Sequence, residues 1–286
     1  MNKLMEEIKN AKKEIIKVEE NSKRELTWDI AKGIGIISIV IRHITINKIA
    51  HDFVYMYHLA IFYFLSAYFY NENKYGDKPF EFFAQRLKTT WPKFVFFSIG
   101  LILCHNLFIK YHLYNPNVEI YSKFDHIISP ILNSMTLQTS EVFAGALWFV
   151  PTLLVSLGLF GGMIYISRNA SKKIGGSGYM FYIASFIGIC FCISASRVIE
   201  KIPLLNKIIA LLGKHSFSIM ALHFACIKGV DAIYSRIIGE TDPEVISKWV
   251  VTYPKELWII YIIIGCGLPV IFSIVLDKIK KEREKI

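Results

Sequence analysis

Long apolar stretches recur along the chain and are separated by short segments rich in charged side chains. Each stretch is close to the roughly 20 residues that cross the hydrocarbon core of a bilayer as a helix. Seven of them stand out, at residues 30–49, 53–70, 92–109, 143–166, 179–196, 216–235 and 257–276. The pattern predicts an all-α protein, a polytopic bundle of transmembrane helices.

The composition agrees with a membrane protein, because 53% of the 286 residues are hydrophobic and 14% are aromatic. Residues 1–27 are rich in Lys and Glu and hold no apolar run, so no cleavable signal peptide is visible. We therefore expect a charged cytosolic segment at residues 1–27, a transmembrane domain at residues 28–277 and a basic cytosolic tail at residues 278–286.

The net charge of +10 comes from Lys and Arg at the ends of the apolar stretches. This distribution follows the positive-inside rule and does not indicate nucleic-acid binding. It predicts a multi-pass protein of the cell membrane with both termini in the cytosol. The loops around residues 74–93 and 166–178 are predicted to lie in the cytosol too. Residues 197–214 are also basic, so the course of residues 179–214 is left open between a re-entrant segment, a return through residues 202–212, and an odd number of absent helices.

Ionisable side chains interrupt the first apolar stretch: Asp29, Lys32, Arg42 and His43. Such groups are unfavourable at membrane depth, so they indicate function. Eleven steps of 100° bring Lys32 and His43 to within about 20° of the same helix face, about 16 Å apart along the axis. Asp29 lies near that face and is placed to pair with Lys32 at i, i+3.

This stretch resembles the opening of the acyltransferase 3 family of integral membrane acyltransferases. In that family a basic residue precedes a His by ten intervening residues, as Lys32 precedes His43. Four further matches follow in the family's order: His58, Phe62, Phe64 and Ser66 of the second helix; Arg86-Leu87-Lys88 with Pro92; Leu147-Trp148-Phe149; and Gly213-Lys214-His215-Ser216 with His223. Together they cover about residues 24–276.

The chain departs from the family pattern in three places. Arg42 stands where the family usually has Gly before the first-helix His, and Ala67 follows Ser66 where a second Gly is usual. The family has about ten helices, and this chain is shorter by about three between residues 149 and 213. The resemblance therefore implies a shortened member of the family.

The resemblance implies an enzyme that moves an acetyl or other short acyl group from cytosolic acyl-CoA to a hydroxyl. The acceptor is a surface polysaccharide, a lipid-linked sugar or a cell-wall glycan, and membrane lipid is a further partner. We interpret His43 as the general base, since an imidazole can accept a proton at neutral pH; the alternative is a packed intramembrane His. His58 either orients the acceptor or His43, or is an interfacial residue beside Tyr55 and Tyr57.

The remaining candidates have a functional and a structural interpretation. Lys32, Arg86 and Lys88 belong at the cytosolic side, where they bind the phosphates of CoA or only snorkel and set topology. Arg42 contacts the substrate or reaches the outer interface. Trp148 is a candidate substrate platform, although packing or an aromatic belt is the commoner role for such a residue.

No metal is expected, because no His or Cys cluster has ligand spacing. The cysteines all fall in apolar runs, are odd in number and form no Cys-x-x-Cys pair, so we interpret them as buried thiols. Acetyl-CoA or another acyl-CoA is then the implied cosubstrate. Two other functions stay open: a transporter or exporter of a polar glycan, with His and Lys lining its pathway, and an inactive scaffold of a polysaccharide assembly complex.

Overall fold

The computed structural model describes residues 26–44, 47–115, 117–169, 189–190, 192–240, 242 and 251–283. Most of the predicted N-terminal segment and most of the 179–196 stretch lie outside the described residues. Part of the region between residues 149 and 213, where the chain is expected to be short of helices, lies outside them as well. Within the described ranges the chain is helical without strands, which confirms the all-α prediction. Residues 26–44 and 192–199 are helical, and the other elements are α2 (Lys48–Tyr55), α3 (Ala60–Tyr68), α4 (Glu72–Tyr75), α5 (Pro79–Leu103), α6 (His105–Lys110), α7 (Phe124–Met135), the 3-10 helix η1 (Val142–Trp148), α8 (Phe149–Asn169), α10 (Pro203–Lys214), α11 (Ser216–Ile237) and α13 (Pro254–Arg283).

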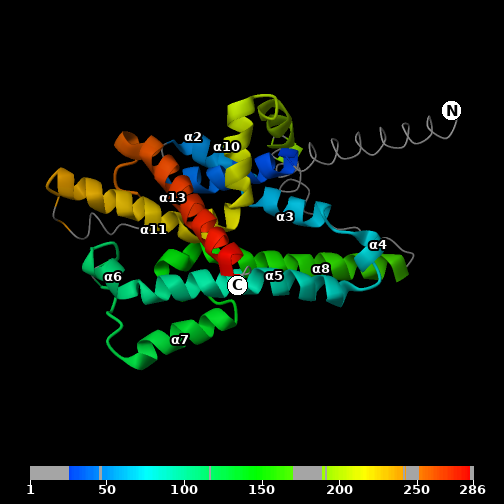
Figure 1. The fold of residues 1–286 in the computed structure, drawn as a ribbon, viewed down its shortest axis with the longest axis horizontal. Coiled ribbons are helices and arrows are strands. Elements are labelled where there is room, and N and C mark those ends of the chain that lie inside the picture. Colours follow the sequence, from blue (N-terminus) through cyan, green and yellow to red (C-terminus); the bar gives the residue numbers. More distant parts are fainter. Residues whose placement is uncertain are drawn as a thin grey trace.

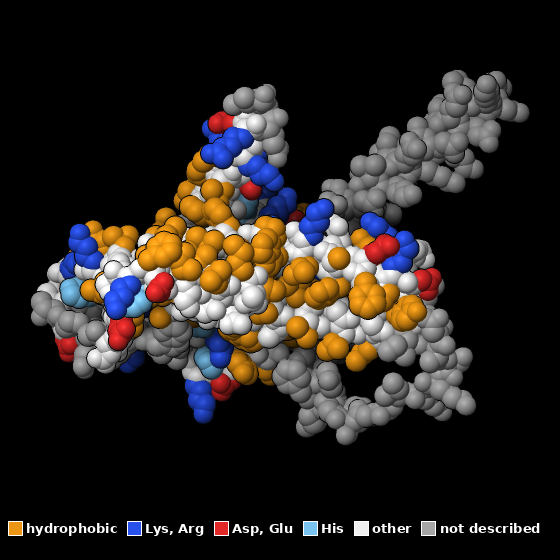
Figure 2. All heavy atoms as spheres, turned by 90° about the horizontal axis from the view of Figure 1, so that it is seen from below, with side chains coloured by type: hydrophobic (Ala, Val, Ile, Leu, Met, Phe, Trp, Pro, Cys, Tyr) orange, Lys and Arg blue, Asp and Glu red, His pale blue; other side chains and the backbone are white. Residues whose placement is uncertain are grey.

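Three described helical segments are long and apolar enough to cross a membrane, namely Val142–Tyr165, Ser216–Ile237 and Pro254–Arg283. They coincide with three of the predicted stretches. Large apolar side chains such as Ile263 and Phe272 are exposed along α13, as expected for a helix that faces lipid. Hydrophobic side chains also cover much of the face shown in Figure 2, while Lys and Arg gather toward its margins. The chain is a membrane protein.

The second apolar stretch is not one helix. Asn47 caps α2, where its side chain accepts a hydrogen bond of 2.7 Å from the backbone N–H of Ile49. Helix α2 therefore runs through residues 50–52, which separate the first two predicted stretches, and the chain turns instead at residues 56–59. Hydropathy reports burial in an apolar medium and does not mark where a helix breaks, so the pattern missed this turn.

The loop predicted around residues 74–93 is mostly the first half of α5. Pro79 stands at the first position of α5, where its fixed φ favours the helix and no N–H is lost. Arg86 and Lys88 consequently lie on a helix and not in a loop, because α5 extends beyond its apolar half.

The helix at residues 26–44 crosses α10 with backbone against backbone. A Cβ built on Gly213 would lie 1.8 Å from the carbonyl oxygen of Asp29, and one built on Gly33 would lie 2.1 Å from that of Ile209. Only hydrogen fits at either position. Helix α11 begins two residues after α10 ends, so this crossing also sets how α11 lies along the helix at residues 26–44.

The other helices complete the bundle around this crossing. Helices α5 and α8 lie side by side and run in opposite directions, and α7 packs against α5 (Figure 1). Helix α11 contacts both α13 and η1. The 3-10 helix η1 is thereby held between α5 and α11, next to the C-terminal part of the helix at residues 26–44.

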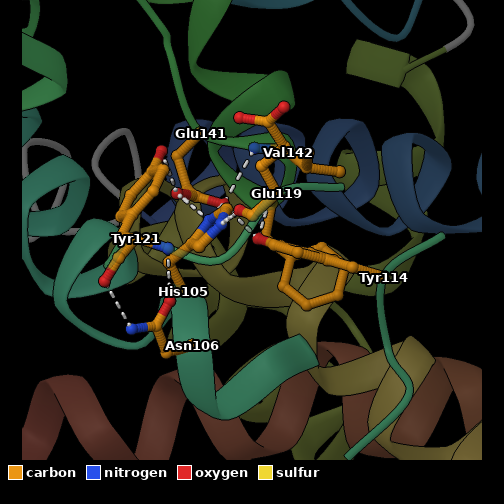
Figure 3. A network of polar contacts seen from close by, with 8 residues as sticks. His105, Asn106, Tyr114, Glu119, Tyr121, Glu141 and Val142 are labelled. Carbon is orange, nitrogen blue, oxygen red and sulfur yellow. Dashed lines mark hydrogen bonds and ion pairs between the residues drawn. The ribbon is translucent and has the colours of Figure 1, made fainter. Parts of the chain in front are cut away.

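A buried polar network fixes the start of η1 (Figure 3). His105 Nδ1 lies 3.0 Å from Glu141 Oε2, and His105 Nε2 lies 3.0 Å from the carbonyl oxygen of Glu119. The Glu119 carbonyl only accepts, so Nε2 donates to it, and a second proton lies between Nδ1 and the Glu141 carboxyl group. The His105 ring stacks on Tyr121 with 3.6 Å between ring centroids.

Glu141 is the centre of this network. It accepts hydrogen bonds from the hydroxyl of Tyr114 and from the backbone N–H of Val142, the first residue of η1. Burial and then the negative charge of Glu141 raise the pKa of Tyr121 to about 12 and raise the pKa of Tyr114 as well. Both phenols therefore stay protonated and remain donors at neutral pH.

We predict that Gly213→Ala destabilises the protein by about 2 kcal/mol or more, because the new methyl group overlaps the backbone at Asp29. Gly162→Ala is the matched control, since a Cβ there meets nothing within 4 Å and the change should stabilise α8 by at most about 1 kcal/mol. Thermal unfolding midpoints of the purified proteins in detergent micelles measure both. Equal midpoints for Gly213→Ala and wild type would contradict the close crossing.

We predict that Glu141→Gln destabilises the protein by about 2 kcal/mol, because the amide group presents N–H donors to neighbours that are themselves donors. Glu119→Gln makes the same chemical change on an exposed side chain and should leave the unfolding midpoint unchanged. If the two variants have the same thermal unfolding midpoint, the Glu141 network does not fix η1.

Candidate active site

Four of the residues singled out from the sequence line one cavity of about 240 Å³: Arg42, His43, His58 and Trp148. They come from the helix at residues 26–44, the turn before α3, and the end of η1. The other lining residues are mostly apolar and are Ile39, Leu59, Gly145, Ala146, Phe149, Met220 and Phe224. A small apolar cavity with a few convergent polar groups is typical of a site where a small group binds and reacts.

His58 is held rigidly in the cavity wall. The side chain is buried, and its Nδ1 lies 2.9 Å from the carbonyl oxygen of Val54. Since a carbonyl only accepts, Nδ1 carries the proton, and in the neutral ring Nε2 is left with a lone pair. The turn that the sequence pattern missed is the element that fixes this tautomer.

His43 lies against two aromatic rings of α11. Its ring centroid is 5.2 Å from that of His223 and 4.4 Å from that of Phe224. His223 is fully buried, and its Nδ1 is 2.9 Å from the carbonyl oxygen of Ile219. Among the described residues, His223 Nε2 has no hydrogen-bond partner. The imidazole of His223, whose Nε2 has no partner among the described residues, therefore lies next to that of His43.

Arg42 and Trp148 lie at the sides of the cavity. The Arg42 guanidinium carbon is 4.6 Å from the centroid of Tyr55, a cation–π contact that holds the arginine near His58. Trp148 is half exposed and lines the cavity. The predicted alternatives for both residues, packing or the membrane interface, are compatible with these positions, and their roles stay predictions.

The predicted cationic residues lie elsewhere. Lys32 Nζ is 3.2 Å from Asp29 Oδ1, so the expected i, i+3 pair is present. Lys214 Nζ approaches the other Asp29 oxygen at 4.0 Å. Lys32 is about 16 Å from His43 along their common helix. The Lys32–Asp29 pair and the His43 imidazole thus occupy two separate regions of one helix, and Arg42 is the charged group beside His43.

Arg86 and Lys88 do not line the His43 cavity. The Arg86 guanidinium carbon packs 5.4 Å from the ring centroid of Phe82, one turn earlier on α5, and Lys88 is exposed. Within the described ranges no three His, Cys, Asp or Glu residues are grouped to hold a metal ion.

Sequence reasoning gave His223 only as part of the late family match and did not place it beside His43. Its place beside His43 depends on how α11 lies along the helix at residues 26–44, which only the Gly33 and Gly213 crossing reveals.

The comparison with known families agrees with the geometry. A family model described as an acyltransferase domain, of the acyltransferase 3 type, matches residues 26–174, just over half of the chain. No curated protein and no solved structure matches. The matched range includes all four of the predicted residues that line the cavity, whereas the resemblance at residues 213–216 and His223 lies beyond it. The chain belongs to the acyltransferase 3 family of membrane acyltransferases.

Proposed function

We propose that this protein transfers an acetyl or other short acyl group from cytosolic acyl-CoA to a hydroxyl of a surface polysaccharide, a lipid-linked sugar or a cell-wall glycan. The observation that carries the proposal is the convergence of His43, His58 and Arg42 on one cavity. Acyl transfer to a hydroxyl requires a base within hydrogen-bond reach and a donor for the developing oxyanion, and these side chains supply both.

The reaction is a direct transfer. His43 takes the proton of the acceptor hydroxyl while the oxygen attacks the thioester carbonyl, so that a C–O bond forms and the C–S bond breaks. The proton then passes from His43 to the departing thiolate. Nε2 of His58 accepts a hydrogen bond that orients the acceptor, and the Arg42 guanidinium stabilises the oxyanion.

The size of the cavity supports a short acyl group. A volume of about 240 Å³ holds about eight molecules of the size of water, at about 30 Å³ each. An acetyl group and the carbon that bears the hydroxyl fit within that space. Phe149, Met220 and Phe224 line this space, which is small for a long acyl chain.

The donor binds from the other end of the same helix. Lys32, together with Arg86 and Lys88 on α5, attracts the phosphates of CoA as cations, and the thioester reaches His43 through the bundle. The positive-inside rule places this end in the cytosol, along with both termini of a multi-pass protein of the cell membrane.

We predict that His43→Gln lowers acyl transfer at least about 100-fold, because the amide cannot take up the hydroxyl proton. The measurement is the O-acetyl content of surface glycans in a deletion strain complemented with the wild-type or variant chain, at equal amounts in the membrane. His126→Gln on α7 is the matched control, since it lies outside the cavity, and should restore full acetylation.

Two results would contradict the proposal. Full restoration by His43→Gln would make His43 a packing residue. Restoration of glycan export without any change in O-acetylation, by the wild-type chain, would favour the transporter or the scaffold.

We predict that Lys32→Gln raises the KM for acetyl-CoA by about tenfold with a smaller effect on kcat, because a phosphate loses one charge-assisted contact far from the reacting atoms. Initial rates in membrane vesicles at varied acetyl-CoA measure both constants. Lys123→Gln, at the start of α7, removes the same charge and serves as the control. An unchanged KM would leave Lys32 with only its structural pair to Asp29.

A further inference from the structure

A second, larger cavity lies apart from the His43 site, between the middle of α5, the start of α11 and the last turns of α13. Its volume is about 650 Å³. The polar residues that line it include Lys93, Lys214, His215, Ser273 and Asp277. None of them lines the His43 cavity, and the matched family range ends before α11 and α13.

The polar part of this cavity carries a net positive charge. Lys93 and Lys214 are both exposed, and Asp277 is the one carboxylate that lines the cavity with them. Lys214 also lies 4.0 Å from Asp29 Oδ2, which does not line the cavity. Lys93 Nζ lies 5.9 Å from the ring centroid of Phe217. His215 Nδ1 is 2.9 Å from Ser273 Oγ, which ties the start of α11 to α13 at the floor of the cavity. The arrangement suits an anionic group such as a phosphate.

An apolar groove of about 490 Å³ continues from this cavity along α5, α11 and α13. The two share Phe96 and Phe97, and the groove then passes Gly100 and Leu103 to Phe108. Its lining is almost wholly apolar, and Leu103 is 67% exposed. A polar cavity with an apolar extension is complementary to a molecule that has a charged head and a hydrocarbon tail.

The length of the groove matches one leaflet of a bilayer. From Lys93 to Cys104 the helix rises about 16 Å, and half of the hydrocarbon core is about 15 Å thick. A soluble phosphate compound would use the polar end alone. A lipid whose phosphate lies at Lys93 has acyl chains that reach the depth of Cys104.

We propose that the cavity and the groove together bind one anionic phospholipid of the surrounding bilayer, with its phosphate against Lys93 and Lys214 and one acyl chain along α5. This proposal goes beyond acyl transfer and does not depend on it. The bound lipid fills the gap between α5, α11 and α13. It thereby supports α11, the helix that carries His223 next to His43.

Gly100→Phe tests the groove. A Cβ on Gly100 meets nothing within 4 Å, so the ring enters open space in the groove without a clash in the backbone. Gly162→Phe on α8 is the matched control, because a Cβ there also meets nothing within 4 Å and Gly162 lines none of this groove. Gly100→Leu is a smaller second variant for use if Gly100→Phe does not fold.

The measurement is native mass spectrometry of the full chain, released from nanodiscs that contain equal amounts of phosphatidylglycerol and phosphatidylcholine. We expect wild type and Gly162→Phe to retain one phosphatidylglycerol and Gly100→Phe to retain it about tenfold less. Retention unchanged by filling the groove, or no preference of wild type for the anionic lipid, would overturn the proposal.

A pair of double variants tests the head of the site. Lys93→Gln with Lys214→Gln should abolish the preference for phosphatidylglycerol, whereas Lys110→Gln with Lys123→Gln removes the same charge from other elements and should preserve it. Displacement of the lipid by acetyl-CoA would assign the cavity to the acyl donor instead. A dimer of wild type that carries no lipid and is broken by Gly100→Phe would assign the groove to a second copy, and either result overturns the proposal.

Discussion

The close contact between the helix at residues 26–44 and α10 is the constraint on which the rest of the site depends. Gly33 and Gly213 meet there with no room for a side chain. His43 lies ten residues after Gly33, about 15 Å along the same helix. Helix α11 begins two residues after α10 ends, so the glycine contact constrains where α11 starts, and along α11 His223 comes to lie 5.2 Å from His43 between ring centroids.

Charged groups inside the bundle show why burial alone does not identify function. Lys228 and Asp231 are buried in α11, with Lys228 Nζ 2.6 Å from Asp231 Oδ2. The same carboxylate accepts hydrogen bonds from the backbone N–H of Thr252 and from the hydroxyl of Tyr261 on α13. These partners satisfy the pair, which therefore joins two helices and offers little to a substrate. His223 Nε2 differs, because among the described residues it has no such partner.

The sequence predicted the parts of the fold that depend on hydropathy and helical periodicity. Apolar length identified the three helices able to cross a membrane, and the spacing of Asp29 and Lys32 predicted their ion pair. The break between α2 and α3 was missed, because Asn47 and the turn at residues 56–59 act through local hydrogen bonds within an apolar run.

The site was predictable to the same extent. Arg42, His43, His58 and Trp148 follow from the motifs, and the fold brings them to one cavity. The contribution of Met220 and Phe224 to that cavity depends on packing between segments about 180 positions apart in the chain, for which no local pattern exists. Lys93 and Lys214 carry no motif of their own as a pair, and their cavity emerges only when α5 and α11 are side by side.

The separation of the two regions along one helix has a mechanistic consequence. If phosphate binding at Lys32 and proton transfer at His43 occurred in one pocket, the ammonium group would disfavour the protonated imidazole that forms when His43 takes up a proton. At about 16 Å, with Asp29 already paired to Lys32, this repulsion is weak. The helix therefore carries the Lys32–Asp29 pair at one end and His43, beside Arg42, at the other.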